Sequence, residues 1–221
     1  MGTIIVIDGL DGSGKATQAN KLKQWLGSEG VQTRLISLPD YDSSSSALVK
    51  MYLRGDFGRN PFEVNPYAAS TFYAVDRFAQ YKIDWESYYN DEGIIIADRY
   101  ISANIIHQGC KIPKDERLDF YNWVYEYEVG KLGLPRETVT ILLEVTPEVS
   151  MQLIYDRCGG NKNNDIHESN LEYLRECYEN AIYAADKLGW HRINCVENEK
   201  MRSTDSILDS IKQIVKTEGI L

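Results

Sequence analysis

The sequence lacks any stretch that could cross a membrane. It contains no run of 18 consecutive apolar residues, which is about the minimum for a helix that spans a bilayer. It also lacks a secretion signal at its start, because the first apolar run after Met1 covers only about five residues and has the pattern of a strand. We therefore expect a soluble, cytoplasmic protein with no membrane partner.

Cysteine and histidine are scarce and scattered. The four cysteines form no C-x-x-C pair, and the three histidines stand too far apart in the chain to suggest a zinc site. The cysteines are Cys110, Cys158, Cys177 and Cys195, and the histidines are His107, His167 and His191. We expect free thiols in a reducing compartment and no structural metal.

Basic residues are outnumbered by acidic ones, with 24 Lys and Arg against 33 Asp and Glu and a net charge of −9. A general nucleic-acid binder needs a basic surface, so this balance argues against nucleic acid as a partner. If the protein binds a phosphorylated ligand, a local cluster of basic residues must bind its phosphate groups. The 221 residues are 43% hydrophobic and show no linker or internal repeat, which predicts one domain over residues 1–221.

A glycine-rich stretch near the start of the chain is the most informative feature. Residues 9–15 fit the pattern G-x-x-x-x-G-K, between a predicted strand over residues 3–8 and a predicted helix over residues 16–26. Glycines let successive backbone N–H groups point at one anion, the helix N-terminus adds partial positive charge, and Lys15 can reach the outer phosphates. The alternative is a glycine turn with a surface lysine. The flanking strand and helix favour a nucleoside-triphosphate site.

One position departs from this pattern. The Ser or Thr whose hydroxyl usually contacts Mg²⁺ is replaced by Ala16, and Thr17 follows it. Because a methyl group cannot bind magnesium, either Thr17 takes over or the ion is held by phosphate oxygens, water and a carboxylate from elsewhere.

Strands and helices alternate along the whole chain. Short apolar runs that end in turn residues predict five strands, over residues 3–8, 33–38, 94–97, 139–145 and 192–196. Periodic patterns predict the main helices over residues 16–26, 66–89, 102–108, 114–131, 169–188 and 203–216, with shorter ones after the serines at 43–46 and at Pro147. The pattern predicts a doubly wound α/β sheet of about five parallel strands flanked by helices, whose ligands bind at the carboxyl ends of the strands.

A triphosphate loop alone does not separate a switch, a motor and a kinase. The guanine-binding element N-K-x-D of switch GTPases is absent, and Asp98 and Arg99 follow a buried strand instead. Asp98 could hold magnesium through water, and Arg99 could bind a second phosphate with two hydrogen bonds. The alternative is an ion pair at the strand end. Tyr73 and Arg77 stand four residues apart on a helix and could together bind a base, although Tyr73 taken alone favours a core position.

At this point the chain resembles the thymidylate kinase family of P-loop nucleoside monophosphate kinases. The resemblance extends from residue 3 to the last helix and rests on an ordered set of motifs. These are GLDGSGK at 9–15, FYAVDR at 72–77, DRY at 98–100, HQG at 107–109 and LLEVTPEV at 142–149. It implies a P-loop NTPase-type fold with a short lid at about 158–168, transfer of the γ-phosphate of ATP to dTMP, magnesium as cofactor, and a homodimer.

The resemblance also implies roles for single residues. Predicted ATP-binding residues are Gly9, Leu10, Asp11, Gly12, Ser13, Gly14, Lys15, Ala16 and Thr17; predicted acceptor-binding residues are Asp11, Pro39, Tyr73, Arg77, Arg99, His107 and Gln108. Asp98 and Thr17 are the metal candidates, and Lys15, Asp98, Arg99, Arg157 and Lys162 are the catalytic candidates. Asp11 would accept a hydrogen bond from the sugar 3′-hydroxyl, and Gln108 would lie near the base.

An arginine over the transferred phosphate is supplied in this family by the P-loop or by the lid. The loop position is Gly12, so the lid must provide it, and the lid is poor in arginine. We expect Arg157 to be the catalytic cation, with Lys162 assisting. Losing such a group costs about 10³-fold or more in rate.

Two positions leave the choice of nucleotide open. His107 stands where the family favours Tyr or Phe, and Tyr41 follows a segment where an arginine often meets the acceptor phosphate. We expect dTMP to be preferred over UMP, CMP and AMP. The alternatives are another P-loop nucleotide or deoxynucleoside kinase, or a catalytically decayed nucleotide-binding protein.

Overall fold

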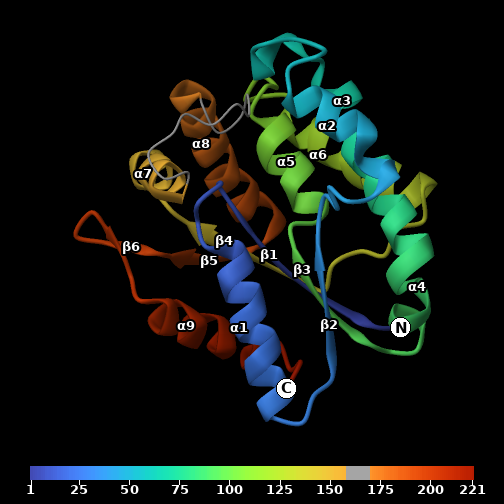
Figure 1. Ribbon diagram of the computed structural model, residues 1–221, viewed down its shortest axis with the longest axis vertical. Coiled ribbons are helices and arrows are strands. Elements are labelled where there is room, and N and C mark those ends of the chain that lie inside the picture. Colours follow the sequence, from blue (N-terminus) through green and yellow to red (C-terminus); the bar gives the residue numbers. More distant parts are fainter. Residues whose placement is uncertain (158–169) are drawn as a thin grey trace.

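The computed structural model describes residues 1–157 and 170–221, and its centre is a parallel sheet (Figure 1). Within these residues the sheet has five strands in the order β2-β3-β1-β4-β5, all parallel. The strands are β1 (Thr3–Gly9), β2 (Thr33–Ser37), β3 (Ile94–Asp98), β4 (Val139–Glu144) and β5 (His191–Asn194). The predicted doubly wound α/β sheet is confirmed.

The helices follow the predicted pattern closely. They are α1 (Lys15–Ser28), α2 (Ala47–Leu53), α3 (Pro66–Gln80), α4 (Glu86–Asn90), α5 (Ile101–Gly109), α6 (Arg117–Tyr125), α7 (Pro147–Arg157), α8 (Leu171–Leu188) and α9 (Thr204–Thr217). The short 3₁₀ turns are η1 (Ser44–Ser46) and η2 (Pro61–Glu63). None of these helices is both long enough and apolar enough to span a bilayer, as far as the chain is described.

Strand β1 shows why the sheet is buried on both faces. Ile5 and Ile7 point toward the layer that contains α1 and α9, whereas Ile4 and Val6 point toward the layer that contains α5, α6 and α8. All four side chains are fully buried. Alternate residues of a strand face opposite sides of a sheet, so a continuous apolar run satisfies both layers.

Local signals determine where the helices begin. Asn65 caps α3, since its side-chain oxygen accepts hydrogen bonds from the backbone N–H groups of Tyr67 and Ala68, and Pro66 occupies the first helical position. Ser43 accepts from the N–H of Ser45 in the same way, so the serine-rich stretch starts a helix as predicted.

Two predicted helices contain π-helical turns. The helix expected over residues 66–89 consists of α3, the π-helical turn η3 (Tyr81–Trp85) and α4. The helix expected over residues 114–131 begins later, because residues 113–116 form a turn, and it ends in the π-helical turn η4 (Glu126–Lys131). Such turns often accompany functional sites.

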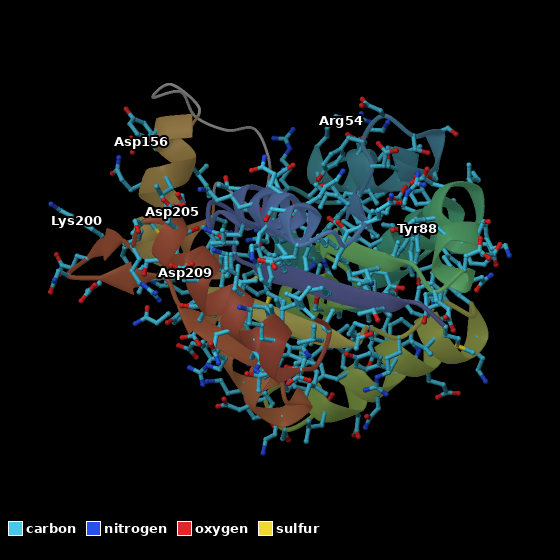
Figure 2. The ribbon with its side chains drawn as sticks, turned by 90° about the horizontal axis from the view of Figure 1, so that it is seen from below. Arg54, Tyr88, Asp156, Lys200, Asp205 and Asp209 are labelled. Atoms are coloured by element: carbon cyan, nitrogen blue, oxygen red, sulfur yellow. The ribbon has the colours of Figure 1, made fainter. Side chains whose placement is uncertain are left out.

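The two ends of the molecule carry different elements. In Figure 2, Arg54 and Tyr88 mark the end that carries α2 and α4, and Asp156 and Lys200 mark the end that carries α7 and a small hairpin. That hairpin, β6 (Val196–Glu197) with β7 (Lys200–Met201), was not predicted. Of the cysteines, Cys110, Cys177 and Cys195 are buried free thiols, as expected, and Cys158 lies outside the described residues.

Candidate active site

The glycine-rich loop connects β1 to α1 as the sequence predicts. Gly9, Gly12 and Gly14 have φ angles of 149°, 77° and 86°, a region that side chains disfavour. A Cβ on Gly9 would lie 2.6 Å from the carbonyl oxygen of Leu143, and one on Gly12 would lie 2.9 Å from that of Ser150. Glycine is therefore required here by close packing against β4 and α7 as well as by the backbone angles.

Lys15 lies within this loop and is largely buried. Its ammonium group donates hydrogen bonds to the carbonyl oxygens of Gly9 at 3.0 Å and Leu10 at 2.6 Å. Burial, followed by the nearby charge of Arg99, lowers the pKa of Lys15 to about 8, although Asp11 opposes this shift. The cation expected to meet the outer phosphates thus stands at the base of the loop, with its charge only partly stabilised.

Arg99 connects the glycine-rich loop to the neighbouring cleft. Its guanidinium forms an ion pair with Asp11 and lies 2.9 Å from Nε2 of His107. Its φ is 68°, a strained angle for a residue with a large side chain, and such strain is found at functional sites. Burial opposes the charge, but the carboxylates of Asp11, Asp8 and Asp98 outweigh burial and raise the pKa of Arg99. Arg99 is therefore a permanent cation at the strand ends.

His107 accepts rather than donates toward Arg99. Burial, and then the charge of Arg99, lower the pKa of His107 to about 3, so the ring is neutral near pH 7. A guanidinium only donates, so Nε2 must be the unprotonated nitrogen and Nδ1 carries the proton, 3.6 Å from Sγ of Cys177.

Asp98 ends β3 beside the loop and is the carboxylate best suited to magnesium. Its Oδ1 is buried and has no hydrogen-bond partner within residues 1–157 and 170–221. Burial raises the pKa of this carboxyl group, and the charges of Lys15 and Arg99 oppose that shift. Thr17, the second predicted metal residue, is exposed, as is Ala16. The described residues contain no group of three or more His, Cys, Asp or Glu side chains arranged to hold a metal. One free carboxylate oxygen fits a magnesium ion whose other ligands are phosphate oxygens and water.

A cleft opens beside the loop at the carboxyl ends of β1, β2 and β3. It holds about 610 Å³ of space that no protein atom fills, open solvent included. Its lining residues are Asp11, Leu38, Pro39, Tyr41, Leu53, Tyr73, Asp76, Arg77, Arg99, Ala103, Asn104, His107 and Gln108. The structure therefore brings together every residue that the sequence predicted for the acceptor.

The end of the cleft away from the loop contains residues that sequence reasoning missed. Glu128, on η4, is fully buried behind the cleft and forms an ion pair with Arg77, with Nε to Oε2 at 2.7 Å. Asn104 lines the cleft and donates to Glu128 at 2.7 Å. Asp76 also lines it, and burial raises the pKa of its carboxyl group. Asn104 could have been found from its place near His107 and Gln108 on α5, but nothing in the sequence marks Glu128.

The predicted lid residues are only partly covered by the structure. Arg157 is the last residue of α7, the helix that packs against Gly12 of the loop through Ser150 and Ile154. Lys162 and the predicted lid at 158–168 lie outside the described residues.

Comparisons with known proteins agree with this geometry. A model of the thymidylate kinase family matches residues 7–207. A probable thymidylate kinase from Methanothermobacter thermautotrophicus is 31% identical over 193 residues, covering 86% of this chain and 84% of that protein. The thymidylate kinase of Mycobacterium tuberculosis is 28% identical over 175 residues, covering 78% of each chain.

A solved structure supports the fold. The thymidylate kinase of Candida albicans has a TM-score of 0.68 with this chain at 18% sequence identity, and the match covers 99% of this chain and 92% of that one. With the family model spanning most of the sequence and the relative from Methanothermobacter thermautotrophicus matching nearly as much, the chain belongs to the thymidylate kinase family.

Proposed function

We propose that this protein transfers the γ-phosphate of ATP to dTMP and releases dTDP and ADP. The main support for this proposal is the cleft. In it, Arg99 lies between the phosphate-binding loop and a pocket lined by Tyr73, Arg77 and Gln108. Two phosphorylated ligands can meet end to end there. Membership of the family supports the same reaction and disfavours the two alternatives, another P-loop nucleotide or deoxynucleoside kinase and a catalytically decayed nucleotide-binding protein.

The residues divide the work by position. Lys15 and the backbone N–H groups of residues 12–17 would hold the phosphates of ATP. Arg99 would bind the acceptor phosphate, and Asp11, which Arg99 contacts, would accept from the sugar 3′-hydroxyl. Magnesium, held by Asp98 through its free oxygen, would neutralise charge on the transferred group. Phosphoryl transfer depends mainly on positioning and charge neutralisation, and this set of groups supplies both.

A coupled assay of ADP release tests the proposal. dTMP, UMP, CMP, AMP and deoxythymidine are compared at the same concentration of MgATP. We expect the highest kcat/KM with dTMP and no turnover of deoxythymidine, because Arg99 would then have no phosphate to bind. A higher kcat/KM for AMP or CMP, or efficient use of the nucleoside, would overturn the assignment.

The catalytic cation of the lid is a separate proposal. Arg157, at the end of α7, would act on the transferred phosphate, and Lys162 would assist. Arg157→Ala should lower kcat about 10³-fold, whereas Lys162→Ala should lower it much less. If Arg157→Ala keeps the original turnover and Lys162→Ala loses it, the roles are reversed.

We also propose a cytoplasmic homodimer. Several predicted aromatic residues fill the core, including Tyr121 and Tyr81, but α3 carries Val75 and Phe78 one turn apart on its surface, 45% and 36% exposed. A second copy of the chain would cover this apolar face. Sedimentation should show a species twice the 25.3 kDa monomer, and Phe78→Glu should return it to the monomer. A monomer alone at micromolar concentration would contradict this.

A further inference from the structure

A buried carboxylate behind the cleft has no role in the proposed chemistry. Glu128 lies on the π-helical turn η4 and is 0% exposed. It does not line the cleft, yet it contacts two residues that do, Arg77 on α3 and Asn104 on α5. A buried charge destabilises the fold unless it is paired, and Arg77 supplies that pairing. Because Glu128 does not line the cleft, it can affect a ligand there only through Arg77 and Asn104.

Glu128 determines which way the Asn104 amide points. Nδ2 of Asn104 lies 2.7 Å from Oε1 of Glu128 and 3.1 Å from the backbone oxygen of Ser70. Both neighbours only accept hydrogen bonds, so the NH₂ group must face them and its two hydrogens are both used. Only Oδ1 of Asn104 is left for a ligand in the cleft, and it can only accept.

Glu128 also orients Arg77. Its carboxylate accepts a hydrogen bond from Nε of Arg77 at 2.7 Å and another from Nη2 at 3.4 Å. Among the residues that the structure describes, Nη1 is therefore the nitrogen left for a ligand. Burial opposes the charge of Arg77, but Glu128 outweighs it and raises the pKa of the guanidinium. Arg77 therefore stays a donor, and the pair as a whole adds no net charge to a pocket for a neutral base.

We propose that Glu128 is a positioning residue that makes the cleft select a pyrimidine with an N–H beside a carbonyl, as in thymine or uracil. This inference rests on the proposed function. An acceptor at Asn104 matches the N3–H of such a base, and a donor at Arg77 matches its O4. Cytosine has an unprotonated N3 and an amino group at these places. Two acceptors would then face each other at Asn104, and two donors would face each other at Arg77.

Gln108 provides an internal contrast. It also lines the cleft and is fully buried, but neither its Oε1 nor its Nε2 has a partner among the described residues. Its amide can turn to present either a donor or an acceptor, so it can bind either base without choosing between them. Discrimination therefore depends on the amide that Glu128 holds fixed.

The test compares kcat/KM for dTMP, dUMP and dCMP in Glu128→Gln and in a control, Glu126→Gln. Glu126 stands on the same turn but is exposed, and it forms a surface ion pair with Lys131. In Glu128→Gln the new NH₂ competes with that of Asn104 and allows the Asn104 amide to turn over. We expect the preference for dTMP and dUMP over dCMP to narrow by about tenfold or more, mainly through KM, with the control unchanged.

A second variant guards against misfolding. Asn104→Ala leaves the pair of Arg77 and Glu128 in place and should also narrow the preference. If both variants lose the same factor with all three acceptors, or keep the original preference, the selection role of Glu128 is wrong. If the unaltered protein phosphorylates none of these acceptors, the proposed function fails instead, and the two failures are thus distinguishable.

Discussion

The two ends of the cleft are built in different ways. At the phosphate end, Lys15 and Arg99 stand on backbone segments that follow β1 and β3, with strained or glycine-dependent angles and carboxylates close by. At the base end, Arg77 and Asn104 stand on regular helices and are held by one buried partner, Glu128. The first end concentrates positive charge that can bind a phosphate. At the second end the charges of Arg77 and Glu128 cancel, and a fixed arrangement of hydrogen-bond donors and acceptors remains. We therefore expect that affinity for the phosphates and selectivity for the base can be changed separately.

The largest expected effect comes from removing the cation between the two ends. Arg99→Ala should lower kcat/KM about 10³-fold, because the acceptor phosphate loses its permanent positive partner. The loss should be the same for dTMP, dUMP and dCMP, since this residue contacts no base in our proposal. Steady-state assays with the three acceptors measure it.

Arg99→Lys serves as the matched control. It keeps the charge but loses the two-pronged geometry and the hydrogen bond to His107, so an intermediate activity is expected. A loss that differs by more than about tenfold among the three acceptors would mean that the phosphate end also selects the base, and the separation of the two ends would be wrong.

A smaller effect should appear in the pH dependence of ATP binding. The pKa of Lys15 is about 8 in the free protein, below its usual 10.5, so its charge is lost as pH rises through about 8. Above this pH, affinity for a non-hydrolysable ATP analogue should fall, by at most about tenfold for each pH unit. Calorimetric titration between about pH 7 and 9.5 measures the effect.

Acceptor binding should not follow the same curve. Arg99 stays charged over this range, because its pKa is raised. The KM for dTMP should therefore stay flat where ATP affinity falls, and Lys15→Arg should remove the pH dependence of ATP binding. A parallel fall of both affinities would indicate that one group serves both ligands.

The difference between the two ends also explains what the sequence could predict. The phosphate end consists of two short stretches, residues 9–15 and 98–99, and each follows a buried apolar run that is easily found in the sequence. The sheet was predictable for the same reason. At the base end the deciding partner of Arg77 is 51 residues away in the chain. Glu128 stands in a stretch rich in Tyr and Glu, and nothing in the sequence distinguishes it from the exposed Glu126 two residues earlier.

The π-helical turns are the other feature that periodicity did not indicate. A period of 3.6 residues predicts a continuous helix over residues 114–131. It does not indicate the π-helical turn η4, on which Glu128 lies. Tertiary packing decides the local geometry there: Glu128 turns inward because Arg77 and Asn104 stabilise its charge. The sequence showed that His107 departs from the family pattern. Its hydrogen bond to Arg99 could be recognised only in the folded structure.

The smallest expected effect concerns the stability of the folded protein. It tests whether His107 is neutral in the folded state and so can accept a hydrogen bond from Arg99 at the phosphate end. The pKa of His107 is about 3 in the folded protein and 6.5 as its ordinary value, so between these limits the unfolded chain binds more protons than the folded one. Stability from this residue is complete above about pH 6.5 and falls as pH decreases toward about 3, by at most about 1.4 kcal/mol for each pH unit.

His107→Phe keeps an aromatic ring beside Tyr173 and removes the titrating group. The variant should lose less stability than the original protein between about pH 7 and 5, as measured by urea unfolding at both values. The difference between the two proteins isolates His107, because other groups such as Asp98 titrate in both. Equal losses would mean that His107 is already protonated in the folded state. Arg99 would then lack a hydrogen-bond acceptor at His107, and its charge would depend on the nearby carboxylates, with Asp11 the first of them.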